Sequence, residues 1–209
     1  MGKMVKTLSN WKRYERKNLQ KADLVITVEE PLRQIYINEV GIPSNNIVPL
    51  PNTPPKNFTK TKLDNDVLEY YNKFFVLFYS GGIDILRGID TAIKALPLIS
   101  SEIAEIKLVL AGKIWKNSDP VKMAQKLGVD KYVDFVGWLS IDQMPSYIAA
   151  SNICFHVPPA HNKEINRTIQ TKIYQYIHLG KPVIVGQPKM AKDFVLNNKI
   201  GFSINEKDH

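Results

Sequence analysis

Short runs of apolar residues alternate with segments of helical periodicity along most of this chain. Such alternation is typical of βαβ units, in which the strands of a parallel sheet are joined by helices that pack on it. The runs predicted as strands are 74–79, 106–111, 133–136, 153–157, 183–185 and 201–204. Between the first two, Ile89, Ile93 and Leu96 share one face at helical spacing. The sequence therefore predicts a doubly wound parallel α/β domain over residues 66–209.

A second, shorter series precedes this domain. A strand is predicted over 23–28, a helix over 31–40 and another strand over 47–50. The next segment, 51–65, holds three prolines and no apolar period, as is typical of a linker between domains. We therefore expect residues 1–50 to be the last part of another α/β domain.

Residues suited to helix ends fall between the predicted strands. Asp119, followed by proline, predicts the start of one helix. Ser140 and Gln143 form a capping box, which predicts a helix from Ser140 to Ala150. A further helix is predicted to begin near Thr171.

The formal net charge of +8 is concentrated at the start of the chain. Residues 1–21 hold seven Lys or Arg residues and one acidic residue, Glu15. The chain has no zinc-finger spacing and no aromatic-rich RNA-binding signature, so we do not expect a nucleic acid as its partner. Trp11 and Tyr14 stand among the basic residues. The segment is interpreted either as a solvated helix face or as an interfacial helix that touches anionic lipid headgroups.

Three further features bear on the compartment. The longest apolar run, 74–79, is far shorter than the ~20 residues that cross a bilayer. Residues 1–21 contain no apolar region of the kind found in secretory signals. The single cysteine, Cys154, cannot form a disulfide within the chain. We expect a cytoplasmic protein, located at the inner face of the membrane if its basic segment binds lipid.

In an open parallel sheet, ligands bind at the carboxyl ends of the strands. The first strand end to inspect is that of 74–79. Gly81 and Gly82 follow it, and two glycines let the backbone come close to a ligand. Arg87 puts a permanent cation at the start of the next helix, which suits a phosphate. Because glycine turns end many strands without binding anything, this signal is weak by itself.

Two later segments strengthen the prediction of a ligand site at the strand ends. Gly137, Trp138 and Leu139 follow the strand 133–136, where Trp138 either borders a nucleobase or packs in the core. In the helix near Thr171, Lys172 adds its charge to the positive helix end, which favours an anion. Gln175 lies one turn further on and can bond to ligand hydroxyls.

Other polar residues carry less weight. His156 and His161 match no metal-site spacing, and a loop histidine without a partner is usually hydrated. Cys154 lies between apolar residues of a predicted strand, so we expect a core residue and not a nucleophile.

Five segments together resemble the nucleotide-sugar domain and crossover of retaining glycosyltransferases of family 4. They are 81–90, 135–137, 172–176, 180–184 and, for the end of the first domain, 22–52. These enzymes have the GT-B fold, in which two Rossmann-like domains face each other. The resemblance implies a Rossmann-like donor domain over 66–209 and the tail of an acceptor-side domain over 1–50.

The resemblance also implies roles for the site residues. Arg87 and Lys172, with Gly81 and Gly82, would hold the donor diphosphate. The backbone of Gly137, Trp138 and Leu139 would hold the base.

Three positions depart from the family pattern. Gln175 stands where the family has the second Glu of its Glu-x7-Glu motif, which binds the ribose. Arg167 stands where the first Glu contacts the transferred sugar, and Glu164 is a nearby substitute. Gly82 takes the place of an arginine that often follows the first glycine.

By this resemblance, the chain would take part in moving a hexosyl group from a nucleoside diphosphate sugar to a glycan or lipid acceptor, with retention and without a cofactor or metal. Cell-envelope polysaccharide is the product class that it implies. The family's acceptor site and catalytic residues lie in the first domain, so we expect a fragment or truncated form with little activity alone. The alternatives are a degenerate GT-B-like binding or scaffolding module and, more distantly, a nucleotide-sugar epimerase.

Overall fold

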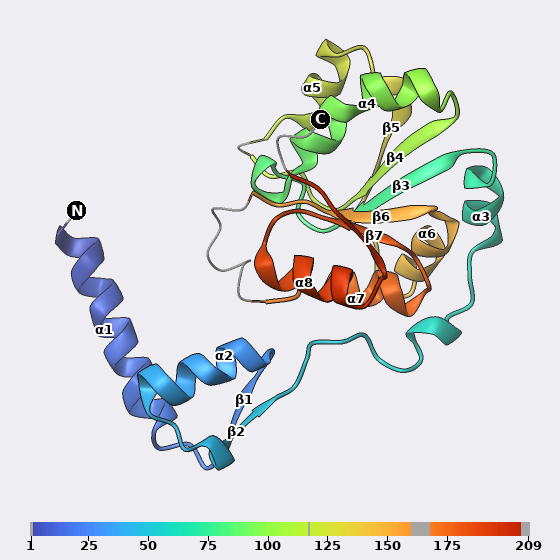
Figure 1. Cartoon of the computed structure of the whole chain (residues 1–209). Coiled ribbons are helices and arrows are strands. Elements are labelled where there is room, and N and C mark those ends of the chain that lie inside the picture. The colour runs from blue at the N-terminus through green and yellow to red at the C-terminus, as the bar shows by residue number, and fades with distance from the viewer. Residues whose placement is uncertain (1, 117, 160–167, 206–209) are drawn as a thin grey trace. The chain divides into compact units, whose positions relative to one another are not determined.

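The computed structural model describes residues 2–116, 118–159 and 168–205 (Figure 1). The chain divides into two compact units, Met1–Asn52 (unit 1) and Thr53–His209 (unit 2). The division falls within the segment 51–65 that the sequence predicts as a linker. Each unit has an apolar core of its own.

Unit 1 is a short βαβ segment preceded by a long helix. Its elements are α1 (Gly2–Leu19), β1 (Val25–Thr27), α2 (Glu30–Ile35), a π-helical turn (Tyr36–Val40), a 3-10 turn (Ser44–Asn46) and β2 (Ile47–Pro49). The two strands pair in parallel. Val25, Ile42 and Ile47 form the buried core, whereas Ile26 and Val48, which are partners across the pair, are exposed. Within unit 1, only one face of the sheet is therefore covered.

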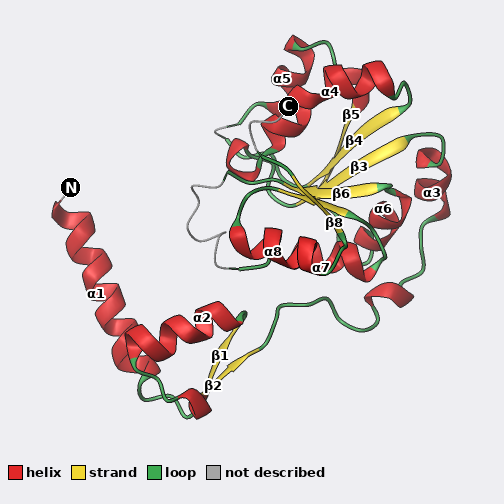
Figure 2. Cartoon of the chain, in the orientation of Figure 1, coloured by secondary structure: helices red, strands yellow, loops and turns green. Residues whose placement is uncertain are grey.

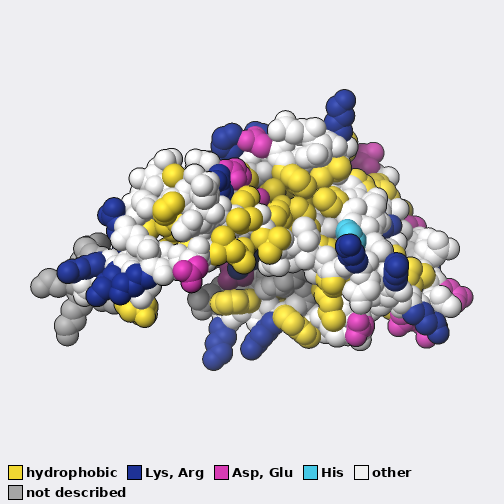
Figure 3. All heavy atoms as spheres, turned by 90° about the horizontal axis from the view of Figure 1, so that it is seen from below, with side chains coloured by type: hydrophobic (Ala, Val, Ile, Leu, Met, Phe, Trp, Pro, Cys, Tyr) yellow, Lys and Arg dark blue, Asp and Glu magenta, His cyan; other side chains and the backbone are white. Residues whose placement is uncertain are grey.

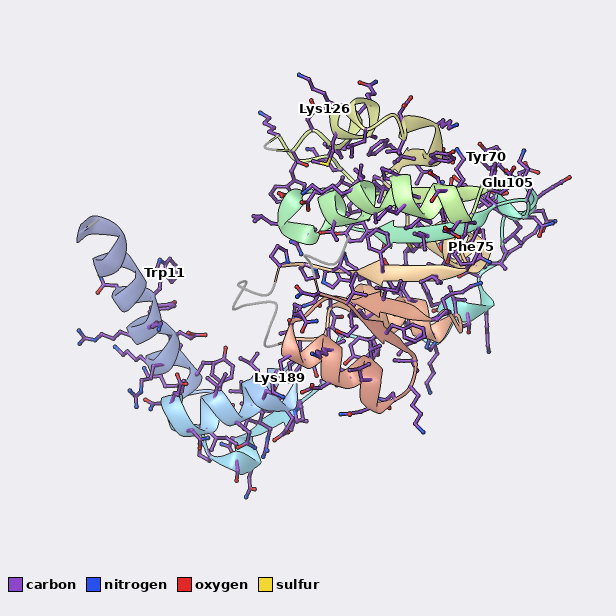
Figure 4. All side chains as sticks on the ribbon, turned by 45° about the horizontal axis from the view of Figure 1, so that its top comes forward. Trp11, Tyr70, Phe75, Glu105, Lys126 and Lys189 are labelled. Carbon is purple, nitrogen blue, oxygen red and sulfur yellow. The ribbon has the colours of Figure 1, made fainter. Side chains whose placement is uncertain are left out.

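Helix α1 carries the basic segment of the sequence. Figure 3 shows Lys and Arg side chains gathered over it, and Figure 4 shows Trp11 projecting away from the helix. Trp11 and Tyr14 are exposed, and their rings meet edge to face with centroids 6.0 Å apart. In the part of the chain that the structure describes, no helix is long and apolar enough to cross a membrane.

Unit 2 is built on a six-stranded parallel sheet (Figure 2). Its strands are β3 (Phe75–Ser80), β4 (Ile106–Ala111), β5 (Val133–Gly137), β6 (Ile153–His156), β7 (Val183–Val185) and β8 (Gly201–Ser203). They lie in the order β5-β4-β3-β6-β7-β8. The chain thus starts at the centre, builds outward to β5, and returns to build outward from β6. This is the doubly wound, Rossmann-like order, so the predicted fold class is confirmed.

Helices cover both faces of this sheet. One face packs against α3 (Asn65–Tyr71), α6 (Met144–Ala150), α7 (Thr171–His178) and α8 (Lys189–Asn197), and the other against α4 (Ile89–Glu102) and α5 (Pro120–Lys126). Side chains of β3 alternate between the two faces, as they must in a strand. Val76 and Phe78 enter the first core, and Tyr79 enters the second. Both faces are buried, as is usual for parallel sheets.

The start of α6 corrects one prediction. Ser140 and Gln143 exchange the two bonds of a capping box, at 3.0 and 3.3 Å, as expected. The helix nevertheless begins only at Met144, because residues 141–143 form a turn. Pro145 has no N–H with which to continue the helical ladder, so regular bonding starts later than the capping box.

A buried tyrosine hydroxyl ties α7 to the end of β3. The backbone N–H of Ser80 donates to Tyr176 Oη at 2.8 Å, and Ser80 Oγ lies 3.1 Å from the same oxygen. Tyr176 is fully buried, and Ser80 is 4% exposed. Since Ser80 is the last residue of β3, this contact fixes helix α7 against the carboxyl end of the central strand.

Replacing that tyrosine should destabilise unit 2. Tyr176→Phe leaves the Ser80 N–H unbonded in the core, which costs about 1–3 kcal/mol. Urea denaturation followed by circular dichroism should show this loss in the free energy of unfolding. Tyr70→Phe, at an exposed tyrosine of α3, is the control and should change little. Equal stability of both variants and the parent would contradict the role of the Tyr176 hydroxyl.

Candidate functional site

The carboxyl ends of β3 and β6 form the topological switch point of the sheet. These strands are neighbours, but the chain leaves β3 toward α4 on one face and reaches α7 on the other face after β6. A crevice opens where adjacent connections diverge in this way, and ligands of doubly wound sheets bind there. The segments predicted to carry the chemistry all follow strands that end at this edge.

The glycine turn, Gly81 and Gly82, follows β3 directly. The N–H of Gly81 donates to the carbonyl of Ala111 at 2.8 Å, and Tyr79 Oη donates to the carbonyl of Gly82 at 3.0 Å. A side chain at Gly81 would meet Lys172, since a Cβ there would lie 2.6 Å from Nζ. Gly81 also has a φ of +133°, which other residues rarely adopt.

A tryptophan lies beside the second glycine. A Cβ on Gly82 would collide with Nε1 of Trp115, which comes from the loop after β4. The N–H of Trp115 donates to the carbonyl of Ile83 at 3.1 Å, and Ile83 donates to Lys113 at 2.9 Å. Backbone hydrogen bonds thus join the loops after β3 and β4 beyond the ends of the strands. The glycines therefore make room for Lys172 and Trp115 in addition to any ligand.

Lys172 brings a cation to this turn from the first turn of α7. Its Nζ lies 3.9 Å from the centre of the Tyr79 ring. Burial, and then the charge of Arg87, lower the pKa of Lys172 well below its usual range. In the part of the chain that the structure describes, no salt bridge joins Lys172 or Arg87 to a carboxylate. Two cations close enough to affect each other therefore lack acidic partners among these residues, which favours an anionic ligand.

Arg87 is held by the turn that leads into α4. It ends a 3-10 turn, Ile85–Arg87, and its N–H donates to the carbonyl of Asp84 at 3.0 Å. Gly88 follows with a φ of +75°, and a Cβ on it would collide with the carbonyl of Val157 after β6. Only glycine allows this approach, so Gly88 places Arg87 beside the end of β6.

The segment predicted to hold a base lies at the same edge. The carbonyl of Gly137 accepts the N–H of Gly112 at 2.7 Å, and Gly112 in turn packs against the carbonyl of Gly81. Trp138 is 80% exposed, so of the two interpretations of this residue, core packing is wrong. Leu139 is buried.

Of the remaining predicted site residues, one lies in the part of the chain that the structure describes and the others lie outside it. Gln175 lies on α7, three residues after Lys172 and so on a neighbouring part of the helix surface. It is partly buried, and its side chain makes no hydrogen bond to a described residue. Glu164, Arg167 and the histidine at 161 lie outside the described residues.

His156 corrects another expectation. It is not hydrated but fully buried at the end of β6, with its ring stacked 6.4 Å from that of Tyr79. Burial, followed by the charges of Lys172 and Arg87, lowers its pKa well below the usual value, so the ring is neutral. Cys154 is buried as predicted, and burial raises the pKa of its thiol to about 12. That thiol is no nucleophile at neutral pH.

Comparison with known families decides the assignment. Residues 60–209 match the model of the family described as glycosyl transferases group 1. The chain belongs to this family. No curated protein matches the sequence. The family-level resemblance drawn from the sequence is therefore confirmed for the group 1 glycosyltransferases.

Solved structures share the fold at low identity. HepE of Anabaena, in complex with UDP, has a TM-score of 0.64 and 19% identity over 91% of this chain and 54% of its own. WaaG, a glycosyltransferase involved in lipopolysaccharide biosynthesis, has a TM-score of 0.65 and 18% identity over 87% of this chain and 49% of its own. Sucrose-phosphate synthase of Thermosynechococcus elongatus has a TM-score of 0.66 and 20% identity over 93% of this chain and 48% of its own.

These alignments reach beyond unit 2. The chain spans about half the length of each of these structures. Unit 2 holds about three quarters of the residues, so alignments that cover 87–93% of the chain also include residues of unit 1. The fold that this chain shares with these structures therefore includes part of unit 1.

Two residues at the site were missed in the sequence. Tyr79, the fifth residue of β3, was assigned only to the strand, and Trp115 was not considered. Trp115 follows the end of β4 by four positions, and β4 neighbours β3. Inspection of every strand end, that of β4 included, would have found it.

The lowered pKa of Lys172 predicts pH-dependent binding of an anion. The ammonium form attracts a diphosphate, so affinity for UDP or a related nucleotide should fall as pH rises through that lowered pKa. Lys172→Arg keeps its charge over the same pH range and should flatten the dependence of affinity on pH. Calorimetric titrations at several pH values measure both. A parent affinity that stays constant over the range would contradict the prediction.

Proposed function

We propose that this chain is the donor-binding portion of a retaining family 4 glycosyltransferase. It would take part in transferring a hexosyl group from a nucleoside diphosphate sugar to a glycan or lipid acceptor. The observation that carries the proposal is the pair of cations, Lys172 and Arg87, without described acidic partners at the switch point of the sheet. A diphosphate supplies the negative charge that this pair lacks.

In this proposal, the cations act on the leaving group. Transfer breaks the bond between the anomeric carbon and an oxygen of the distal phosphate, and negative charge builds on that oxygen. Lys172 and Arg87, fixed before the reaction, would stabilise this charge without reorganisation. They would supply the positive charge that a metal ion supplies elsewhere, so we propose that no metal is obligatory.

The remainder of the donor would extend along the same edge. The backbone of 137–139 would hold the base, which leaves the exposed indole of Trp138 beside it. Gln175, one turn from Lys172, would bond to the ribose hydroxyls. The contact from Gly137 through Gly112 to Gly81 supports this path, because it joins the base side to the phosphate side through backbone.

Calorimetry with UDP, GDP and ADP tests the proposal. One of the three should bind, and binding should depend on Arg87. A guanidinium that contacts a diphosphate contributes roughly 1.5–3 kcal/mol, so Arg87→Ala should weaken binding about 10- to 100-fold. The melting temperature should change little, because Arg87 forms no salt bridge in the described structure.

Arg13→Ala, at an exposed arginine of α1, is the matched control and should bind like the parent. Parent-like affinity of Arg87→Ala would remove Arg87 from the site. Failure of the parent to bind any of the three nucleotides would overturn the enzyme proposal and favour a scaffolding module.

The ribose contact has a separate test at Gln175. A carboxylate accepts a stronger hydrogen bond from a hydroxyl than an amide does, but it also repels the diphosphate. We expect the ribose contact to dominate, so Gln175→Glu should preserve or tighten nucleotide binding and Gln175→Ala should weaken it. Titrations of both variants decide: if both bind like the parent, Gln175 is not a ligand.

A further inference from the structure

One tyrosine contacts both parts of the proposed diphosphate site. Tyr79 is fully buried near the end of β3, so it does not reach a ligand itself. Its ring lies 3.9 Å from Nζ of Lys172, and its hydroxyl donates to the carbonyl of Gly82 at 3.0 Å. The cation and the glycine turn come from segments about 90 residues apart in the sequence. Tyr79 is the side chain that joins them.

The ring contact supplies what Lys172 lacks among the described residues. An ammonium over an aromatic face is attracted by the negative centre of the ring. Lys172 has no described carboxylate partner, and the charge of Arg87 opposes its own. Among the described residues, His156 of β6 is the other titratable group beside Lys172, and it is neutral. Tyr79 thus favours the charged form of Lys172 without neutralising it, whereas a carboxylate would cancel the charge meant for a ligand.

The hydroxyl fixes the turn. Burial raises the pKa of Tyr79, so the phenol keeps its proton and stays a donor. Its bond to the carbonyl of Gly82 orients the peptide between Gly82 and Ile83, directly after Gly81, where a Cβ would touch the Lys172 ammonium. A second ring, that of Phe155, packs in the same core, with its centre 5.4 Å from the centre of the Tyr79 ring.

We propose that Tyr79 is a positioning residue that sets the Lys172 ammonium and the glycine turn in place for a diphosphate. This inference rests on the proposed function for its ligand, but not for the contacts themselves. Loss of the ring should make Lys172 lose its proton at lower pH. Loss of the hydroxyl alone should loosen the turn and leave the titration of Lys172 unchanged.

The test separates the two contacts. Tyr79→Phe keeps the ring and removes the hydroxyl, whereas Tyr79→Leu and Tyr79→Met remove both. The titration of Lys172 is followed in the ligand-free chain by NMR of ¹³Cε-labelled lysine, with Lys172→Arg used to assign the signal. Affinity for UDP, GDP or ADP is measured in parallel. Phe155→Leu, which removes a ring from the same core, controls for general loosening, and melting curves of all variants report folding.

We expect the midpoint of Lys172 to fall by about 0.4–1.5 pH units in Tyr79→Leu and Tyr79→Met, the range that a cation–π contact implies. Tyr79→Phe should keep the midpoint of the parent and bind nucleotide several-fold more weakly. Phe155→Leu should keep the midpoint. An unchanged midpoint in whichever of the Leu and Met variants folds, or an equal shift in Phe155→Leu, would overturn the proposal. If the midpoints shift but no nucleotide binds the parent, the positioning contact stands and the proposed function fails.

Discussion

The bond between Tyr176 and Ser80 is the contact on which the site depends. A parallel sheet with diverging connections creates a crevice, but the topology alone does not place charged or polar side chains in it. Here the hydroxyl of Tyr176 joins the last residue of the central strand to helix α7. Lys172 lies one turn before Tyr176 in that helix and is thereby brought to the glycine turn. This bond therefore joins the helix that carries Lys172 to the strand that leads into the glycine turn.

Charge is gathered at this edge without being neutralised by the residues that the structure describes. Gly88 lets the start of α4 approach the end of β6, which sets Arg87 close enough to depress the pKa of Lys172. The partner of Lys172 is the ring of Tyr79, which attracts a cation but carries no net charge. Such a site costs stability when empty, because like charges repel and one is partly desolvated. An anion that binds at this site offsets both the repulsion between the two cations and the desolvation of the buried one.

The sequence predicted the elements and site residues that depend on local residue pattern, and it missed the contacts that depend on tertiary packing. The strands Ile106–Ala111 and Val183–Val185 have the bounds expected from their apolar runs. Helix α8 was not expected, because it begins after Pro188 without a side-chain cap. Gly81, Arg87 and Lys172 were singled out from strand ends and helix starts, and the fold brings them together. The contacts of Tyr79 and Trp115 and the burial of His156 could not be read from the sequence, since each results from packing between distant segments.

A crystal structure of the chain with a bound nucleoside diphosphate tests the central claim most directly. The account predicts the diphosphate at the carboxyl ends of β3 and β6, with Lys172 Nζ and the Arg87 guanidinium within hydrogen-bond distance of its oxygens. The contacts of Tyr79 with Lys172 and Gly82 should persist. A nucleotide bound at any other surface, or at this edge without contact to either cation, would contradict it.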